Sequence, residues 1–536
     1  MLKNLHKTVV CILWIVALPF CLLAQQSDII ILYDNDVHCA VDGYAKIAGL
    51  RDELKKQNEN VMLVSCGDFL SGGSLGTCSK GEYIANIMDA CGYEYVTLGN
   101  HEFDFTPNHL IELSQFMPKT HIVCCNFFSK QSKSPVFNEC LTNYFGNRSV
   151  VFIGVTTPDA AVSSSPKNFI DENGRVVYDF CTKNYTKIVQ KEVDLARSYK
   201  PDYIVLLAHL GTETSTKLIQ ETTGIDVVLD GHSHDSIPMQ IVKNKAGKDV
   251  VLSSTGCKFQ SIGKLTIAQD GTISTELLTT KDIPYENEYI AEIIRESKEQ
   301  CEGKNDDSYL CINHGLNLPL YDAKGERLPY KQGCTIGALC ADAMKTVLET
   351  NIAVINGGSI RAPFPNGKIT LHDLYETVPF EDTISIVTMQ GSDILDMLEV
   401  GASKCPQEYG GFLHTAGLQY VIDTNIKSPV VVKRNGFAEV KNGKRRVVSA
   451  NIVEGKYNYP LNPNETYTVA ISSFLLDHGD GYNIRYTLKN TDDTIYMRKR
   501  FTQCRTMQEI FAEFFMRLNG TINFTYEGLL NPVRIK

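Results

Sequence analysis

The stretch GNHEFD, Gly99 to Asp104, decides the fold expected for the first half of the chain, because it places amide, imidazole and carboxylate groups directly after an apolar run. Four other apolar runs in this half end in similar polar segments: DNDVH (Asp34 to His38), GDF (67–69), AHLG (208–211) and DGHSH (Asp230 to His234). In an open α/β sheet the carboxyl ends of neighbouring strands converge on one crevice. We therefore expect side chains that are far apart in the sequence to meet at one site.

The pattern around these segments alternates short apolar runs with amphipathic segments from Ser27 to about Ile283, which predicts a layered α/β domain. The predicted strands are Ile29 to Tyr33, Val61 to Ser65, Tyr95 to Leu98, His121 to Cys125, Val150 to Val155, Tyr203 to Ala208 and Val227 to Asp230. The predicted helices are Ala45 to Gln57, Tyr83 to Ala90 and Asp179 to Ser198. We assign residues 27–285 to this first domain.

A polar stretch, residues 286–307, contains one predicted helix and is expected to link the first domain to a second one at 308–536. The second half opens with a predicted helix at Ile336 to Glu349 and a strand at Ile352 to Ile355, and then becomes rich in strands and turns. A chain of 536 residues is long enough for two or three domains with sizeable cores.

The composition is that of an ordinary globular protein, with 43% hydrophobic and 21% charged residues. The formal net charge of -10 gives no indication of a partner that is a nucleic-acid polymer, although a local basic pocket could still bind phosphate. The oligomeric state is not determined by the sequence.

The first 24 residues have the layout of a secretory signal peptide. Lys3 and Lys7 precede an apolar run from Thr8 to Ala24, and polar residues follow it. An uncleaved membrane anchor is the alternative, because the run is close to the ~20 residues that a membrane helix needs. No later stretch is long and apolar enough to span a bilayer. We expect export to the periplasm or the extracellular space, with cell-surface anchoring if the segment is retained.

Cysteine pairing cannot be deduced from the sequence. The chain has 17 cysteines, and cleavage after Ala24 removes Cys11 and Cys21, which leaves an odd number. At least one cysteine is therefore unpaired within the mature chain. Cys39 and Cys66 lie beside the polar segments, but we expect each to be a small buried residue and not a metal ligand.

The donors in the polar segments suit a pair of divalent metals. Carboxylate, imidazole and carboxamide groups together favour Zn, Mn, Fe or Co, with Zn or Mn expected here. There are too many candidate ligands for one ion, whereas two ions that share a carboxylate would use them all. Such a pair lowers the pKa of bound water and holds the oxygens of an in-line displacement at phosphorus. The set therefore predicts a phosphoesterase.

The order of these segments resembles that of the calcineurin-like metallophosphoesterases, and within them the two-domain 5'-nucleotidase and UDP-sugar hydrolase family, over nearly the whole mature chain. The resemblance implies a four-layer α/β/β/α domain followed by a smaller α/β 5'-nucleotidase C-terminal domain, with the helix in residues 286–307 as a hinge between them. It implies that Asp36, His38 and His234 bind one metal, that Asn100, His209 and His232 bind the other, and that Asp68 bridges them. His101 would face the phosphate, positioned by Asp104, while Glu102 would be structural.

The second half supplies candidates for substrate selection in NGGSIR (Asn356 to Arg361), PFEDT (Pro379 to Thr383) and FLLDHGDGY (Phe474 to Tyr482). Taken alone, each segment would normally be a turn or contain a core aromatic residue. The resemblance implies that Phe380 and Phe474 stack on the base, and that Asn356, Arg361 and Asp480 make polar contacts. The family also has a further phosphate-binding arginine where this chain has Tyr330, Lys331 and Gln332; Arg327 or Lys331 could replace it.

We expect an exported enzyme that uses hydroxide bound by two metals to release phosphate from nucleoside 5'-monophosphates. Within the enzyme class, the alternatives are cleavage of UDP-sugars or dinucleotides at their pyrophosphate and hydrolysis of 2',3'-cyclic nucleotides. An alternative from another class is a nucleotide-binding or surface protein without turnover.

Overall fold

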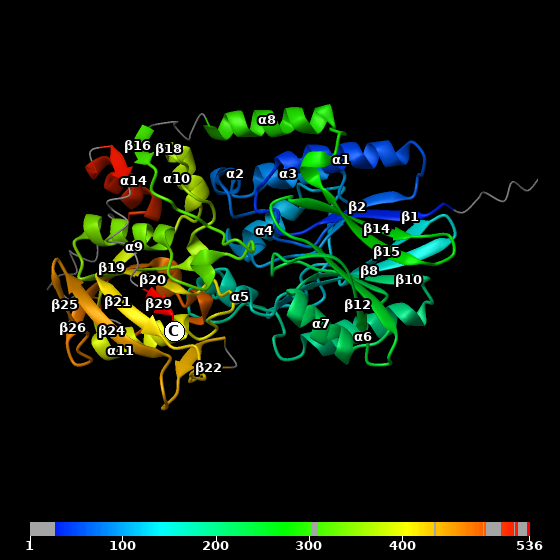
Figure 1. Cartoon of the computed structure of the whole chain (residues 1–536). Helices are drawn as coiled ribbons and strands as arrows, with labels where there is room; N and C mark the ends of the chain where they lie inside the picture. The colour runs from blue at the N-terminus through cyan, green and yellow to red at the C-terminus, as the bar shows by residue number, and fades with distance from the viewer. Residues whose placement is uncertain are drawn as a thin grey trace, which may run out of the picture.

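The computed structural model describes residues 27–302, 309–433, 436–485, 487–488, 505–518, 520–523 and 533–535. The expected signal peptide, residues 1–24, lies outside this range. Figure 1 shows two parts of the chain side by side, the N-terminal part in blue to green and the C-terminal part in green to red. Within the described ranges, none of the helices combines the length and apolar character that crossing a membrane requires.

The N-terminal part is built on two mixed six-stranded sheets. The order in the first is β15 (Ile273–Thr279), β14 (Ser261–Ile267), β1 (Ile29–Asp34), β2 (Val61–Ser65), β3 (Tyr95–Val96) and β4 (His121–Ile122). The order in the second is β12 (Ser236–Lys243), β13 (Asp249–Thr255), β11 (Val227–Leu229), β10 (Tyr203–His209), β8 (Arg148–Thr156) and β7 (Cys140–Phe145). β1, β2 and β3 run parallel, as do β8, β10 and β11, so their carboxyl ends lie at the same edges.

The alternation of side chains along the strands explains the layers. Ile31 of β1 and Val205 of β10 belong to one buried cluster, which lies between the two sheets. Leu32, on the opposite face of β1, packs with residues of α1 (Asp42–Lys55) and α3 (Glu82–Cys91). Leu206, on the opposite face of β10, packs with residues of α6 (Tyr185–Ser198) and α7 (Thr212–Glu221). Because successive strand residues point to opposite faces, the two helix layers enclose the two sheets and give the expected α/β/β/α order.

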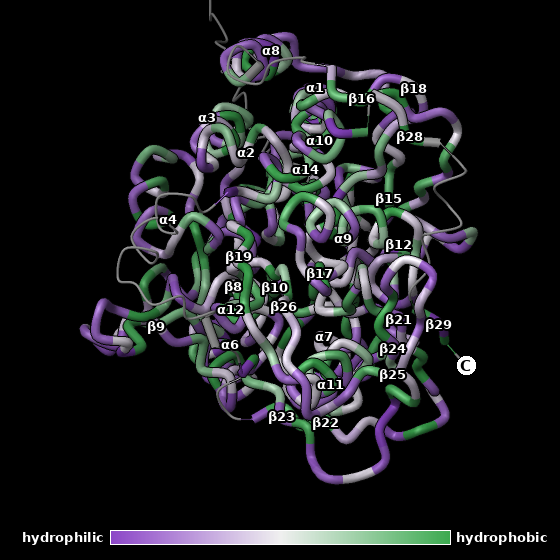
Figure 2. Tube along the Cα trace, turned by 90° about the vertical axis from the view of Figure 1, so that its left-hand side faces the viewer, coloured by the Kyte–Doolittle hydropathy of each residue, from purple (hydrophilic) through white to green (hydrophobic). Residues whose placement is uncertain are grey.

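The long helix α8 (Glu288–Glu302) lies along the N-terminal part, above α1 in Figure 1 and again at the top of Figure 2, where it is seen nearly end-on and contains both hydrophilic and hydrophobic residues. Its apolar side includes Ile290 and Ile294, which are buried with the residues of α1 and α3. A disulfide joins Cys301 near its end to Cys78 of α2 (Ser74–Ser79). Packing and a covalent bond therefore both attach this helix to the first domain.

The C-terminal part contains a five-stranded sheet between helices. Its strand order is β20 (Leu413–Ala416), β17 (Ile352–Asn356), β26 (Thr466–Ser472), β19 (Ile384–Gln390) and β27 (Thr487–Leu488). Ala353 and Ile355 of β17 pack on the side of α9 (Thr335–Leu348), whereas Ile352 and Val354 pack on the side of α11 (Gly391–Gly401). The chain is therefore a two-domain α/β protein, as expected.

Most predicted elements agree with the structure to within a few residues. One difference is the helix expected from Asp179, which begins only at Tyr185. Asp179 instead lies in the short strand β9 (Tyr178–Asp179) and accepts a hydrogen bond from the Cys181 backbone amide. A side chain that binds a nearby backbone amide offers the chain an alternative to helix at this point.

Candidate active site

The structure brings the polar segments of the first domain together at the carboxyl ends of the parallel strands. Asp36 and His38 follow β1, Asp68 follows β2, and Asn100 and His101 follow β3. From the second sheet, His209 is the last residue of β10, and His232 and His234 follow β11. Two sheets that pack face to face thus supply one cluster, which is the convergence expected at the strand ends.

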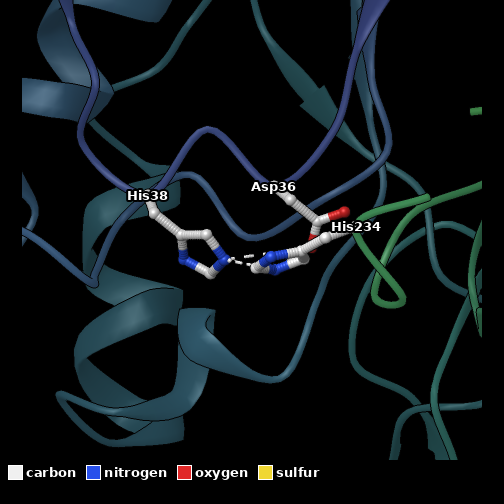
Figure 3. A group of neighbouring side chains, drawn as sticks. All are labelled: Asp36, His38 and His234. Carbon is white, nitrogen blue, oxygen red and sulfur yellow. Dashed lines mark hydrogen bonds and ion pairs between the residues drawn. The ribbon is translucent and has the colours of Figure 1, made fainter. Parts of the chain in front are cut away.

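Figure 3 shows one group in this cluster, formed by Asp36, His38 and His234. The two imidazole rings point toward each other, and their Nε2 atoms lie 3.0 Å apart. His234 Nε2 also lies 3.4 Å from Asp36 Oδ1. Three nitrogen and oxygen donors therefore face a common point, within 4.8 Å of one another.

A second group consists of Asp68, His209 and His232. His209 Nε2 lies 3.2 Å from Asp68 Oδ2, and His209 Nδ1 is held by the Cys66 carbonyl at 2.7 Å. Asp68 also forms a third group, with His38 and His101, and His38 Nε2 lies 3.8 Å from Asp68 Oδ2. Asp68 consequently lies between the first and second groups.

The side-chain atoms in this cluster fit bound cations. Asp36 Oδ1, Asn100 Oδ1 and His209 Nε2 are buried and have no hydrogen-bond partner among the described residues. A buried polar atom without a partner carries a desolvation cost, which a metal ligand bond would offset. The donors are oxygen and imidazole nitrogen, as borderline divalent ions prefer. Asp36, His38 and His234 would hold one ion, and Asn100, His209 and His232 another, with Asp68 between them.

The electrostatics of the cluster also favour cations. Burial lowers the pKa of His38 well below its ordinary value, and it lowers the pKa of His232 to about 3, so both rings are neutral, as metal ligands must be. Burial acts in the same direction on His209, but the nearby Asp68 and Asp36 carboxylates outweigh it and raise the pKa of His209 to about 10. The carboxylates therefore create a negative potential that stabilises a positive charge at this point.

The backbone around the cluster adopts an unusual conformation. The left-handed region, which non-glycine residues rarely occupy, contains five of the candidate ligands: Asp36, His38, Asp68, His232 and His234. Left-handed backbone costs free energy at such residues and concentrates at functional sites. Aspartate and histidine do not by themselves favour this backbone conformation, so the surrounding structure must hold it.

Glu102 supplies part of that support. Its buried carboxylate accepts hydrogen bonds from four backbone amides: Asp68 at 2.8 Å, Phe69 at 2.8 Å, Leu70 at 3.0 Å and Gly99 at 2.6 Å. It therefore fixes the loop that carries Asp68 to the loop that carries Asn100 and His101. This agrees with a structural role for Glu102.

His101 and Asp104 form a pair beside the cluster. His101 Nδ1 lies 2.7 Å from Asp104 Oδ2, which also accepts a hydrogen bond from Ser71 Oγ at 2.7 Å. Ser164 Oγ donates to the other carboxylate oxygen at 3.1 Å. Burial lowers the pKa of His101, but the Asp104 and Asp68 carboxylates together outweigh it and raise the pKa overall. No motif in the sequence indicated Ser71 or Ser164.

Arg361 of the second domain reaches into the cluster. Its Nη2 lies 3.2 Å from His101 Nε2 and 3.3 Å from both ring nitrogens of His38. Its backbone carbonyl accepts a hydrogen bond from Lys258 Nζ at 2.9 Å, and the Lys258 backbone amide donates to the Asp36 carbonyl. Lys258 thus connects the first domain to the segment that carries Arg361, a role that the sequence pattern did not predict.

The other second-domain candidates lie next to this arginine. The Phe380 ring stacks on His101 with centroids 5.6 Å apart. Asn356 Nδ2 donates to Asp480 Oδ2 at 3.0 Å. Burial raises the pKa of Asp480 to about 6, opposed by the Asn356 hydrogen bond and by the positive charges of Lys404, His101 and Arg361. Phe474 is half-buried and lies in the short helix α12 (Ser473–Leu476).

Arg327 and Lys331 are the two residues that could replace the further phosphate-binding arginine of the family, and both have carboxylate partners. Lys331 Nζ pairs with Asp322 at 2.6 Å and with Glu326, away from the histidines. Arg327 pairs with Glu408 at 2.7 Å but also extends Nη1 to within 3.0 Å of His234 Nδ1. Arg327 therefore faces the cluster and Lys331 does not.

Comparison with known proteins gives matches across both domains. A family model described as calcineurin-like phosphoesterase matches residues 30–236, and one described as the 5'-nucleotidase C-terminal domain matches residues 321–486. Human 5'-nucleotidase is 27% identical over 86% of this chain and 85% of its own length. The snake venom 5'-nucleotidase of Naja atra is 25% identical over 86% of this chain and 92% of its own.

Another relative is larger. The trifunctional nucleotide phosphoesterase protein YfkN of Bacillus subtilis (strain 168) is 26% identical over 94% of this chain, which spans 35% of that protein. Among solved structures, a 5'-nucleotidase precursor from Thermus thermophilus has a TM-score of 0.78 at 23% identity, covering 95% of this chain and 99% of its own. A sulfate thiohydrolase, SoxB, from Thermus thermophilus has a TM-score of 0.73 at 17% identity, with 95% and 97% covered. At these identities the two structures establish the fold alone.

Proposed function

Because the chain belongs to the family that joins a calcineurin-like phosphoesterase domain to a 5'-nucleotidase C-terminal domain, we propose that it hydrolyses nucleoside 5'-monophosphates and releases phosphate. The observation that carries the proposal is the meeting of the histidine and carboxylate groups with Arg361 and the His101–Asp104 pair. Ligand groups for metal ions, an arginine that can bind an anion and a histidine that can donate a proton therefore face one point.

Arg361 supports an anionic substrate. It is only 8% exposed, and within the described part of the chain it forms no ion pair with a carboxylate. A buried guanidinium without a counter-ion is costly unless an anion binds to it. Its planar group of donors suits phosphate oxygens. A phosphate bound between Arg361 and the ligand groups would supply the missing negative charge.

The remaining residues have distinct roles in this proposal. Divalent ions at the ligand groups would activate water and bind phosphate oxygens. His101, with Nδ1 held by Asp104, presents Nε2 toward the same point as Arg361 Nη2 and would protonate the leaving oxygen of the nucleoside. Asn356 and Asp480 would bind the nucleoside through hydrogen bonds, and Phe380 and Phe474 would contact its base.

We also propose that the protein works outside the cytoplasm. The Cys78–Cys301 disulfide supports this, because disulfides persist in oxidising compartments. The layout of residues 1–24 predicts a signal peptide, and the related protein from Naja atra is named as a venom protein. Detection of the processed chain in a periplasmic or culture-medium fraction would test the proposal, and its recovery with the cytoplasm would contradict it.

Two alternatives remain within the same fold. The same cluster could cleave the pyrophosphate of a UDP-sugar or a dinucleotide, or open a 2',3'-cyclic nucleotide, and one relative is itself named trifunctional. A nucleotide-binding protein without turnover is a further alternative. Rates with AMP, UDP-glucose and 2',3'-cyclic AMP, measured side by side on protein loaded with Zn or Mn, would separate these functions.

Replacement of His101 tests the catalytic role. His101→Ala should slow phosphate release from AMP by about 10²- to 10⁴-fold, because it removes the proposed proton donor. Metal content by elemental analysis should stay near the wild-type value. His121→Ala, at an exposed histidine of β4, is the control and should keep full activity. Equal rates for the His101 variant and the control would exclude the role.

A further inference from the structure

Tyr330, at the end of the short helix η4 (Leu328–Tyr330), contacts both arginines that reach the histidine groups. Its hydroxyl accepts a hydrogen bond from Arg361 Nη1 at 2.8 Å. The Arg327 guanidinium lies over its ring, with Cζ 4.0 Å from the ring centroid. The side chain is buried, so one aromatic residue links the two guanidinium groups by its edge and its face.

Arg361 depends on this contact for its direction. Its Nη2 faces His38 and His101, whereas its Nη1 donates to the Tyr330 hydroxyl. The Tyr330 hydroxyl, which is neutral, thus holds one end of the Arg361 guanidinium without neutralising its charge. A long arginine side chain loses considerable rotamer freedom when it is held in one geometry, so a partner that holds it before the substrate arrives improves binding.

Arg327 is held from three sides. Its Nε donates to Glu408 Oε2 at 2.7 Å, its ring contact with Tyr330 covers one face, and its Nη1 lies 3.0 Å from His234 Nδ1. Arg361 and Arg327 therefore approach the Asp36, His38 and His234 group from different directions. Tyr330 is the side chain that the two have in common.

The backbone around Tyr330 is also fixed. The Tyr330 carbonyl accepts a hydrogen bond from the Tyr409 amide at 2.9 Å, and the Pro329 carbonyl accepts one from His414 Nε2 at 2.9 Å. The Tyr409 hydroxyl in turn donates to the Asp480 carbonyl at 2.6 Å. Through Tyr409, the segment that carries Tyr330 is thus connected to the segment that carries Asp480, a proposed contact of the nucleoside.

We propose that Tyr330 is a positioning residue for the hydrolysis, which sets the Arg361 and Arg327 guanidinium groups so that they receive the phosphate of the substrate together. The inference rests on the proposed function, since the phosphate is that of the nucleotide. Tyr330 acts through the arginines and does not itself need to touch the reacting atoms. Its hydroxyl serves Arg361, and its ring serves Arg327.

Tyr330→Phe separates these two contributions, because it removes the hydroxyl and keeps the ring. It should raise KM for AMP and the inhibition constant of inorganic phosphate in parallel, by about 5- to 10-fold, the range for one lost hydrogen bond. The kcat should change by less than about twofold, since the metal ligands and His101 are untouched. Tyr330→Leu also removes the ring, and its effects on both constants should be larger.

Tyr420→Phe is the matched control. The Tyr420 hydroxyl is also buried and donates to the Leu413 carbonyl at 2.6 Å, in the same domain, and among the described residues it has no hydrogen bond to an arginine. This variant measures the general cost of losing a buried tyrosine hydroxyl, and its KM should stay at the wild-type value. Equal KM and phosphate inhibition constants for the Phe variants at 330 and 420 would overturn the proposal.

A double-mutant cycle tests whether Tyr330 acts through Arg361. In an Arg361→Ala background, Tyr330→Phe should change the phosphate affinity by less than about twofold, because the partner of the hydroxyl is already absent. A full 5- to 10-fold effect in that background would contradict the mechanism. Direct titration of metal-loaded protein with inorganic phosphate gives the same comparison without turnover. If the wild-type protein binds phosphate but hydrolyses no nucleotide, the proposed function is wrong. The role of Tyr330 in holding the arginines is then still tested by the phosphate affinities of the variants.

Discussion

The candidate ligands of the first domain and the candidate nucleoside contacts of the second are held in different ways. Asp36, Asp68 and His209 are at most 2% exposed and lie at the ends of parallel strands. Phe380 and Phe474, by contrast, are half-buried, with Phe380 in a bend of the chain and Phe474 in the short helix α12 (Ser473–Leu476), and Asp480 lies in the short helix η6 (Gly479–Gly481). The first set is enclosed by two packed sheets, whereas the second is presented by connecting segments of a separate domain.

This difference indicates that the two domains have separate functions, metal binding in the first and substrate selection in the second. Groups that must hold cations at fixed separations benefit from rigid strand ends, while groups that select a substrate can vary on loops over a constant scaffold. Changes in the first domain should therefore affect every phosphate ester, and changes in the second should affect nucleotides selectively. A small ester without a nucleoside, p-nitrophenyl phosphate, distinguishes the two classes.

The largest effect is expected from Asp68→Ala. Asp68 lies in two of the ligand groups, so its loss should weaken both sides of the centre and lower kcat by about 10³-fold or more. The loss should be similar for AMP and for p-nitrophenyl phosphate. Steady-state rates with both substrates and metal content by elemental analysis are the measurements. A loss confined to AMP would contradict the proposed division.

A smaller effect is expected from Glu102→Gln. One carboxylate oxygen accepts from Asp68 and Gly99, and the other from Phe69 and Leu70. An amide group would place N–H donors against two of these amides and displace the Asp68 loop. Metal affinity should fall by about 10- to 100-fold, as for other groups that orient metal ligands.

Glu399→Gln provides the control for this variant. Glu399 is also fully buried and accepts hydrogen bonds from the Arg446 and Val447 amides, each at 2.9 Å, in the second domain. Both variants should lower the unfolding temperature, but only the Glu102 variant should lose metal affinity in a titration with Zn or Mn. If the Glu102→Gln variant binds metal as tightly as the wild-type protein, Glu102 contributes to stability alone.

Phe474→Ala should affect nucleotides selectively. Loss of stacking on a base costs about 1 to 3 kcal/mol, so KM for AMP should rise roughly 5- to 100-fold. The kinetics with p-nitrophenyl phosphate should not change, because that ester has no base. Phe116→Ala, at a 66% exposed phenylalanine of the first domain, should leave both substrates unaffected. Equal losses with both esters would show that Phe474 supports the fold and does not bind the base.

The smallest expected effect is a pH dependence of nucleoside binding. Burial raises the pKa of Asp480 to about 6, so its carboxylate is ionised above that pH and, in the proposed role, would accept hydrogen bonds from the nucleoside, whereas below that pH it is protonated and would lose this ability. Inhibition by adenosine should therefore weaken a few-fold as the pH falls through about 6. Asp480→Asn should remove this dependence, whereas phosphate inhibition should keep the same pH profile in both proteins.

Much of the fold and of the ligand cluster could be predicted from the sequence, for one physical reason. Apolar runs that end in polar residues mark strands whose carboxyl ends meet, and the residues from Asp36 to His234 are indeed gathered there. The boundary of α6 was less predictable, because the local hydrogen bonds of Asp179 compete with helix formation.

The supporting residues could not be predicted in the same way. Lys258 connects Asp36 to Arg361 through its backbone and its side chain, and Tyr330 joins Arg361 to Arg327. Nothing in their local sequence differs from an ordinary loop. Their roles depend on contacts between segments that are far apart in the chain.

The sequence by itself determined the donor chemistry of this protein, because the type of each side chain and its place after a strand are local properties. Only the tertiary structure decided that Arg327, and not Lys331, faces the histidines, and that Phe380 lies on His101. Such choices follow from how two domains pack against each other. Packing depends on the summed fit of many distant side chains, which no single segment encodes.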